Sequence, residues 1–193
     1  MAKRFGLVID QERCIGCHAC TVACKLENGI ETGSWTHVET VGGAEMDTAS
    51  GTFPHLSMYY TLRFCMHCAN PPCLDACPTE AIYKRDDGIV LIDAEKCNGC
   101  LACVPVCPYN ALTYNEGSGV VEKCTLCSHR IDQGLEPFCV LCCEGNAMLF
   151  GDLEDPDSAA SRLVTERQGQ VLEPDMGTRP AVYFCPPLAR AEV

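Results

Sequence analysis

The placement of cysteine constrains this chain more than any other feature of its sequence. Sixteen of the 18 cysteines fall into four blocks of four, and in every block three residues separate the last two cysteines. The blocks are Cys14, Cys17, Cys20 and Cys24; Cys65, Cys68, Cys73 and Cys77; Cys97, Cys100, Cys103 and Cys107; and Cys124, Cys127, Cys139 and Cys143. Thiolates at such short intervals are suited to binding metal, so we expect inorganic material to organise much of the fold.

The spacing indicates iron-sulfur clusters. Three cysteines two residues apart can hold three corners of a [4Fe-4S] cubane, and in two-cluster bacterial ferredoxins the fourth cysteine serves the other cluster. A disulfide framework is the usual alternative in a short secreted chain, but the apolar run from Phe5 to Ile9 is too short for a secretory signal. Zinc suits an isolated pair such as Cys124 and Cys127, but not the triple spacing.

Composition and charge narrow the function further. The 47% hydrophobic fraction of the 193 residues counts the cysteines, so the organic core is modest and the metal-free chain should be largely unstructured. A formal net charge of -12 argues against nucleic acid as a partner. The acidic surface either steers docking to a basic patch on a redox partner or only keeps the protein soluble.

An internal repeat predicts the local structure. A shift of 83 residues aligns Leu7–Cys14 with Val90–Cys97, and Gly16, Ala19 and Cys24 with Gly99, Ala102 and Cys107. In each copy a short strand leads into the cluster loop, and a short helix is expected after the third cysteine to carry the fourth. The sequences that follow the last cysteines of the second, third and fourth blocks are also alike, and in that alignment Cys143, not its neighbour Cys142, matches Cys77 and Cys107.

Spacing alone leaves the pairing of blocks open, because the gaps from Cys77 to Cys97 and from Cys107 to Cys124 both suit a two-cluster unit. Pro78 and Pro108 follow the last cysteines of the second and third blocks, as in the bacterial ferredoxin run. This favours one unit from the two middle blocks, nested inside another from the outer two. The predicted ligand sets are Cys14, Cys17, Cys20 and Cys143; Cys65, Cys68, Cys73 and Cys107; Cys77, Cys97, Cys100 and Cys103; and Cys24, Cys124, Cys127 and Cys139.

The expected fold class is α+β, with two nested ferredoxin-like units. Residues 1–24 and 120–150 form the outer unit, and residues 65–119 the inner one. Residues 25–64 are an inserted loop and hairpin that covers one end of the row of clusters. Residues 151–193 are expected to form a short helix, capped by Asp157 or Ser158 and running through Gln168, and then an extended, proline-rich tail. These two outer segments either grip a partner or only shield the clusters.

The chain resembles the four-cluster electron-transfer subunits of the dimethyl sulfoxide reductase family of molybdopterin enzymes, which includes polysulfide, thiosulfate, tetrathionate and arsenate reductases. The resemblance covers almost the whole length and rests on the order of the blocks and on further motifs. These motifs are Cys65–Cys73, Lys123–Cys127, Phe150–Leu153 with Asp155-Pro156, and Gly177–Pro180. It implies the nested pairing, a large catalytic partner with a molybdenum or tungsten bis-pterin cofactor, and often a quinol-linked membrane subunit.

One departure from the family pattern is Glu144, which stands where a proline usually follows the fourth block. A carboxylate beside a cluster would lower its reduction potential, whereas a solvent-facing Glu144 would have no effect. Cys142 and Cys185 have no predicted role and are expected to be small buried apolar residues. His18 and His67 are interpreted as surface groups or as groups that tune potential by hydrogen bonds. Cationic side chains near the blocks either offset cluster charge or face solvent, namely Lys25, Arg63, Lys96, Lys123 and Arg130.

The sequence thus predicts a non-catalytic subunit with four [4Fe-4S] clusters, which relays electrons between a molybdopterin subunit and a quinol-linked or soluble carrier. No phosphate-binding loop, nucleophile elbow or HExxH motif occurs. A free-standing polyferredoxin and the cluster subunit of a formate dehydrogenase or hydrogenase complex are alternatives. No stretch is long enough for a membrane helix. Assembly should begin in the cytoplasm, where thiols stay reduced, and a signal on the partner would decide whether the complex is exported to the periplasm.

Overall fold

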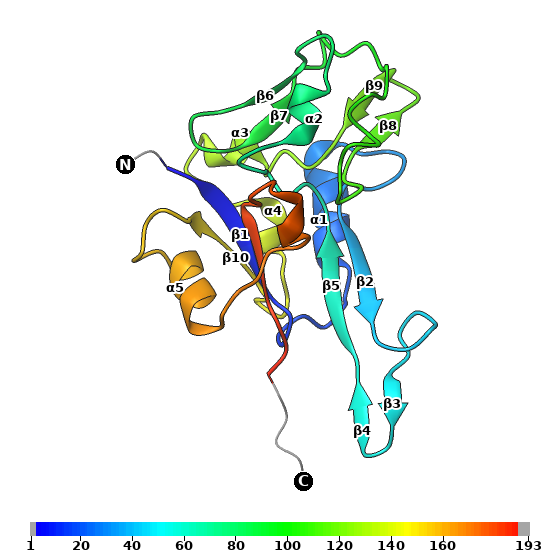
Figure 1. The fold of residues 1–193 in the computed structure, drawn as a ribbon, viewed down its shortest axis with the longest axis vertical. Helices are drawn as coiled ribbons and strands as arrows, with labels where there is room; N and C mark the ends of the chain where they lie inside the picture. Colours follow the sequence, from blue (N-terminus) through cyan, green and yellow to red (C-terminus); the bar gives the residue numbers. More distant parts are fainter. Residues whose placement is uncertain (1–2, 189–193) are drawn as a thin grey trace.

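A three-stranded sheet lies at the centre of the computed structural model, which describes residues 3–188 (Figure 1). The strand order is β10–β1–β11, where β1 (Phe5–Asp10) pairs antiparallel with β10 (Met148–Asp152) and parallel with β11 (Val182–Cys185). Side chains alternate between the two faces of a strand. Leu7 and Ile9 accordingly enter the main core while Val8 packs on the other face, so β1 is buried on both sides.

The elements that cover this sheet are short. Helix α1 (Ala19–Asn28) packs against α4 (Phe138–Leu141), and α5 (Ala159–Glu166) covers the face that carries Val8. The remaining helical segments are α2 (Pro72–Asp75), α3 (Ser128–Ile131) and the 3₁₀ turn η1 (Pro174–Met176). The result is a small mixed fold of α and β elements, with few helices and short strands.

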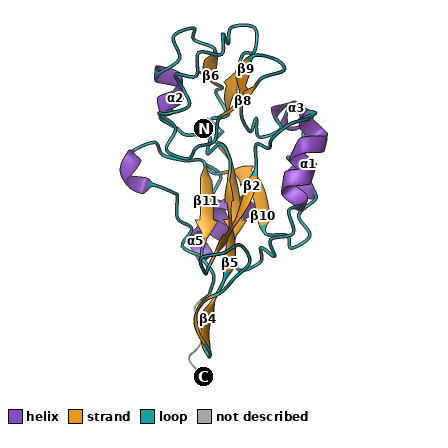
Figure 2. Cartoon of the chain, turned by 90° about the vertical axis from the view of Figure 1, so that its right-hand side faces the viewer, coloured by secondary structure: helices purple, strands orange, loops and turns teal. Residues whose placement is uncertain are grey.

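Two hairpins belong to residues 65–123. Strand β6 (Ile82–Lys84) pairs with β7 (Val90–Ile92), and β8 (Thr113–Asn115) pairs with β9 (Val120–Glu122). In both views these hairpins and α2 occupy one end of the molecule (Figures 1 and 2). Residues from the two ends of the predicted outer unit lie together, because β1 pairs with β10 and α1 packs on α4.

The inserted segment forms a long hairpin that projects from the other end (Figures 1 and 2). Strand β2 (His37–Val41) pairs with β5 (Tyr59–Arg63), and β3 (Ser50–Thr52) pairs with β4 (His55–Ser57) beyond them. Tyr60 packs on the loop of the first cysteine block, so closely that a Cβ at Gly16 would lie 2.5 Å from its ring. Gly16 also has φ +68°, which favours glycine.

The repeat predicts the strands well and the helices only in part. Strands β1 and β7 occupy the two aligned segments. Helix α1 carries the fourth cysteine of the first block, as predicted, although it begins at Ala19 and so includes the third cysteine, Cys20, as well. No helix follows Cys103 in the third block, where only turns occur. Pro105 explains the difference, because it cannot donate a backbone hydrogen bond and it disfavours helical geometry at Val104.

The C-terminal region also differs in part from expectation. Ser158 caps α5 by accepting a hydrogen bond from the backbone N–H of Ser161, as one of the two predicted caps. The helix ends at Glu166, because Gln168 has φ +52° and leaves the helical region. The proline-rich segment is not a simple extended tail: it contains η1, and β11 is an inner component of the fold, since Val182 and Cys185 are fully buried.

Candidate metal centres

Four cavities in the structure are each lined by four cysteines, and each set matches one of the sets predicted from sequence. Site 1 has Cys14, Cys17, Cys20 and Cys143. Site 2 has Cys65, Cys68, Cys73 and Cys107. Site 3 has Cys77, Cys97, Cys100 and Cys103. Site 4 has Cys24, Cys124, Cys127 and Cys139. The folded chain therefore brings together cysteines that are as many as 129 residues apart, as 143 − 14 for site 1.

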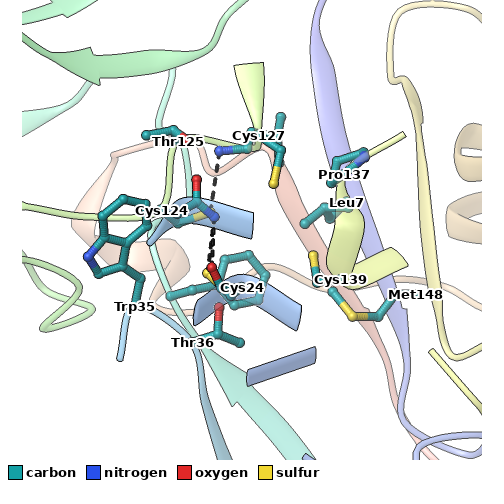
Figure 3. Close-up of a pocket in the computed structure, with 13 residues that line it drawn as sticks. Leu7, Cys24, Trp35, Thr36, Cys124, Thr125, Cys127, Pro137, Cys139 and Met148 are labelled. Atoms are coloured by element: carbon teal, nitrogen blue, oxygen red, sulfur yellow. Dashed lines mark hydrogen bonds between the residues drawn. The ribbon is translucent and has the colours of Figure 1, made fainter. Parts of the chain in front are cut away.

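Site 4 shows how such a cavity is built (Figure 3). Cys24 comes from α1, Cys139 from α4, and Cys124 and Cys127 from the loop before α3. The sulfur atoms of Cys24, Cys127 and Cys139 face a common space in this view. Apolar side chains complete the wall, among them Leu7 and Met148.

The last two cysteines of every block go to different sites. On α1, Cys20 belongs to site 1 and Cys24 to site 4, and residues four apart share one face of a helix. The same division holds in the fourth block, where Cys139 belongs to site 4 and Cys143 to site 1. In the middle blocks, Cys73 and Cys107 belong to site 2, while their block partners Cys77 and Cys103 belong to site 3.

The loops that carry the cysteines have two common features: residues with left-handed backbone conformation, and backbone N–H groups that donate to cysteine sulfur atoms. Gly16 and Gly99 have φ +68° and +67°, and the aligned pair His18 and Leu101 have φ 59° and 62°. The repeat identifies the glycines, but no sequence signal marks the non-glycine pair. Backbone N–H groups donate to cysteine Sγ atoms, for example Ala147 to Cys143 (3.2 Å), Leu126 to Cys124 (3.4 Å) and Val121 to Cys97 (3.5 Å).

Burial makes most of these thiols poor acids in the metal-free state. Burial, opposed by the backbone N–H of Thr21, raises the pKa of Cys20 to about 11. Burial and then the charge of Cys65 raises the pKa of Cys73 to about 12, an effect that Lys123 opposes. Burial would also raise the pKa of Cys77, but hydrogen bonds from Thr79 and from nearby backbone groups lower it overall. Because the thiolate is the metal ligand, a bound cation must supply most of the stabilisation.

The donor sets fit a cluster better than a single ion. Within residues 3–188, no group of three or more His, Cys, Asp or Glu side chains could hold one metal ion. A cubane instead takes each thiolate on a different iron and so needs wider spacing. Of the three described buried side-chain N or O atoms without a hydrogen-bond partner, two belong to residues that line site 4, Trp35 and Thr125. The fit to a cluster rests on the four thiols, which are the donor set that a [4Fe-4S] cubane takes.

The two spare cysteines and Glu144 lie outside the cavities. Cys142 is the C-cap residue directly after α4 and lines none of the four sites, whereas the adjacent Cys143 lines site 1. Cys185 is fully buried on β11, as expected of a small apolar residue. Glu144 is exposed, in agreement with the solvent-facing alternative.

The histidines and basic residues near the blocks separate into exposed and buried groups. His18 is exposed, and so is the Lys96 side chain, which pairs with Asp93. Of the other cationic side chains, Lys25 bonds two loop carbonyls, Arg63 pairs with Glu39 and Arg130 with Glu27. His67 and Lys123, in contrast, are only 1% and 3% exposed. Sequence alone did not distinguish these two from the rest.

Comparisons with known proteins agree with this chemistry. A family model described as a 4Fe-4S dicluster domain matches residues 56–153, and one described as a 4Fe-4S binding domain matches residues 5–26. The chain is 46% identical to a Halobacterium salinarum protein named as a dimethyl sulfoxide reductase iron-sulfur subunit, covering 93% of this chain and 78% of that one. It is 38% identical to the B subunit of tetrathionate reductase from Salmonella typhimurium (94% and 72% covered) and 36% identical to the B polypeptide of polysulfide reductase from Wolinella succinogenes (96% of each).

Proposed function

The chain belongs to the family of iron-sulfur B subunits of dimethyl sulfoxide reductase-type molybdopterin enzymes, and on that premise we propose that it is an electron-transfer subunit with four [4Fe-4S] clusters. The observation that carries the proposal is the set of four cavities, each lined by four cysteines. When bound, each cluster takes up and passes on electrons one at a time. The cysteines hold the clusters, and the surrounding apolar residues keep most of them from water.

The contacts between cavities support a linear order: site 1, site 4, site 2, site 3. Sites 1 and 4 share α1 and the fourth block, and sites 2 and 3 share the second and third blocks. Sites 4 and 2 are neighbours across the core, because Cys124 and Cys65 belong to the same cluster of buried residues. Burial first, and then Cys24, Cys139 and Cys65, raises the pKa of Cys124 well above its ordinary value.

Exposure supports the same order. Of the sixteen cysteines, all within the described residues, only Cys17 and Cys100 are exposed. They belong to sites 1 and 3, the two ends of the order, whereas the cysteines of sites 4 and 2 are buried or half-buried. Each exposed cysteine also has an exposed apolar neighbour, Ile15 (61%) or Leu101 (41%). Two exposed ends and a buried middle are suited to passing electrons between two docked partners.

The partners follow from the family. Relatives are B subunits of tetrathionate and polysulfide reductases, so we propose that one end docks a molybdenum or tungsten bis-pterin subunit, which carries out the catalysis. The other end would face a quinol-linked membrane subunit or a soluble carrier. No helix within residues 3–188 is long and apolar enough to cross a membrane.

Purification of the chain with its genomic neighbours tests the proposal. We expect about sixteen irons per chain, EPR signals from several interacting clusters on reduction, and a large partner that contains molybdenum or tungsten. About eight irons would contradict the assignment of four clusters. Full iron content with no such partner would favour a free-standing polyferredoxin, and a formate-oxidising or hydrogen-oxidising partner would favour the third alternative.

A further inference from the structure

Lys123 is the one buried lysine or arginine within residues 3–188, with 3% of its surface exposed. Its ammonium group donates to the carbonyl oxygens of Val90 and, at 3.1 Å, of Cys124. No described carboxylate pairs with it. A buried charge is costly unless it is compensated, and two neutral carbonyls compensate a full positive charge only in part.

The Lys123 ammonium group lies close to two of the candidate cluster sites. Lys123 lines the cavity of site 2, while the next residue, Cys124, belongs to site 4. Lys123 therefore stands at the junction of the two middle sites. Both sites are expected to hold negatively charged clusters with their thiolates, and each reduction adds a further negative charge.

His67 lies at the same junction but adds no charge. It is fully buried between Cys65 and Cys68 of site 2, and its Nδ1 accepts the backbone N–H of Val90 at 3.1 Å. The same residue, Val90, accepts from Lys123 with its carbonyl. Because Nδ1 is the acceptor in the hydrogen bond from the Val90 N–H, it carries no proton, and the imidazole in this geometry is neutral.

We propose that Lys123 sets the reduction potential at this junction, where its fixed positive charge favours the reduced state of the cluster at site 2 and, to a lesser degree, that at site 4. This inference rests on the proposed function, because it requires the clusters. Electrostatic interactions are stronger in a buried environment than in water. The lysine thereby makes it easier for an electron to reach the middle of the row, where two negative clusters face each other.

The test is a potentiometric titration of the holoprotein, followed by EPR, in K123Q and K123M. Both variants remove the charge, and K123Q keeps an N–H donor for the carbonyls. We expect at least a tenfold change in one redox equilibrium, a downward shift of about 59 mV for one electron, confined to the middle clusters. K96M is the matched control: Lys96 directly precedes Cys97 as Lys123 precedes Cys124, but its side chain is 61% exposed. K96M should leave the middle potentials unchanged, and K123R should keep them near those of the wild type.

Each outcome decides the question. Unchanged potentials in a fully loaded K123Q or K123M overturn the proposal and leave Lys123 as a structural donor to two carbonyls. If K123Q and K123M lose iron while K123R retains it, the iron content follows the charge at this position and the proposal is supported. If K123Q, K123M and K123R all lose iron, the proposal is refuted. A wild-type protein without four clusters would instead refute the proposed function, so the two failures are distinguishable.

Discussion

Replacement of Cys143 by alanine is expected to remove the cluster at site 1 and leave the other three in place. Cys143 lines that site with Cys14, Cys17 and Cys20, and its Sγ accepts the backbone N–H of Ala147 at 3.2 Å. Loss of one cubane of four should lower the iron content from about sixteen to about twelve per chain. Alanine is preferred to serine because a hydroxyl could still bind iron.

The adjacent Cys142 provides the control. It is half-buried, lines none of the four sites and has no predicted role, so Cys142→Ala should retain about sixteen irons. Iron and acid-labile sulfide are measured on both variants, together with the EPR spectrum of the reduced protein. Electron transfer to the partner that docks at site 1 should fail in C143A only. Equal iron content in the two variants, or loss of iron in C142A alone, would refute the assignment of Cys143.

Three other predictions concern the scaffold. Arg167→Met removes the partner of the buried Asp10 carboxylate, which Arg167 contacts at 3.0 Å. The free energy of unfolding should fall by about 3 kcal/mol, and a lower melting temperature of the holoprotein would report this. The exposed Arg162→Met is the control. Removal of iron by a chelator should abolish most of the circular dichroism of the folded state, because iron binding and folding are coupled; an unchanged spectrum would show that the fold stands without metal. Replacement of residues 42–58 by Asn-Gly joins β2 to β5 by a short turn and removes the exposed side chains of Met46, Phe53 and Leu56. This change should reduce the amount of partner that co-purifies, while the iron content stays constant.

Repeated, regularly spaced residues were the most informative part of the sequence. Cysteine spacing predicted the four blocks, and Pro78 and Pro108 favoured the pairing whose four groups line the four cavities. The repeat predicted β1, β7 and α1. The same repeat wrongly predicted a helix in the third block, since alignment of Cys103 with Cys20 gives no weight to Pro105. Whether the cysteines hold clusters as grouped stays a prediction.

The position of the C-terminal strand in the sheet could not be predicted. Strand β11 joins the sheet beside β1, about 175 residues earlier in the chain, as 182 − 7 for the first paired residues. Its neighbours reach the second block as well: Thr178 and Arg179 accept backbone hydrogen bonds from Asn70 and Ala69. Deletion of the residues after Glu173 would therefore remove β11 and with it part of the core. A loss of partner binding in such a variant would not show that this segment contacts the partner. No periodicity in a proline-rich segment indicates such contacts.

The three junctions between neighbouring sites differ in how the chain connects them. The junction between sites 1 and 4 and the junction between sites 2 and 3 are connected covalently, because each of the four blocks divides its last two cysteines, four residues apart, between the two sites. On α1 that separation is about 6 Å along the helix axis. The junction between sites 4 and 2 has no shared block. Its two linings meet at consecutive residues instead, because Phe64 of site 4 precedes Cys65 of site 2 and Lys123 of site 2 precedes Cys124 of site 4.

Side chains with almost no exposure, such as Met66 and Leu126, pack in the same core as Cys65 and Cys124. Changes in that core should therefore alter the relative position of sites 4 and 2. At this junction a buried charge lies close to both neighbouring sites, because Lys123 lines site 2 and is followed by Cys124 of site 4.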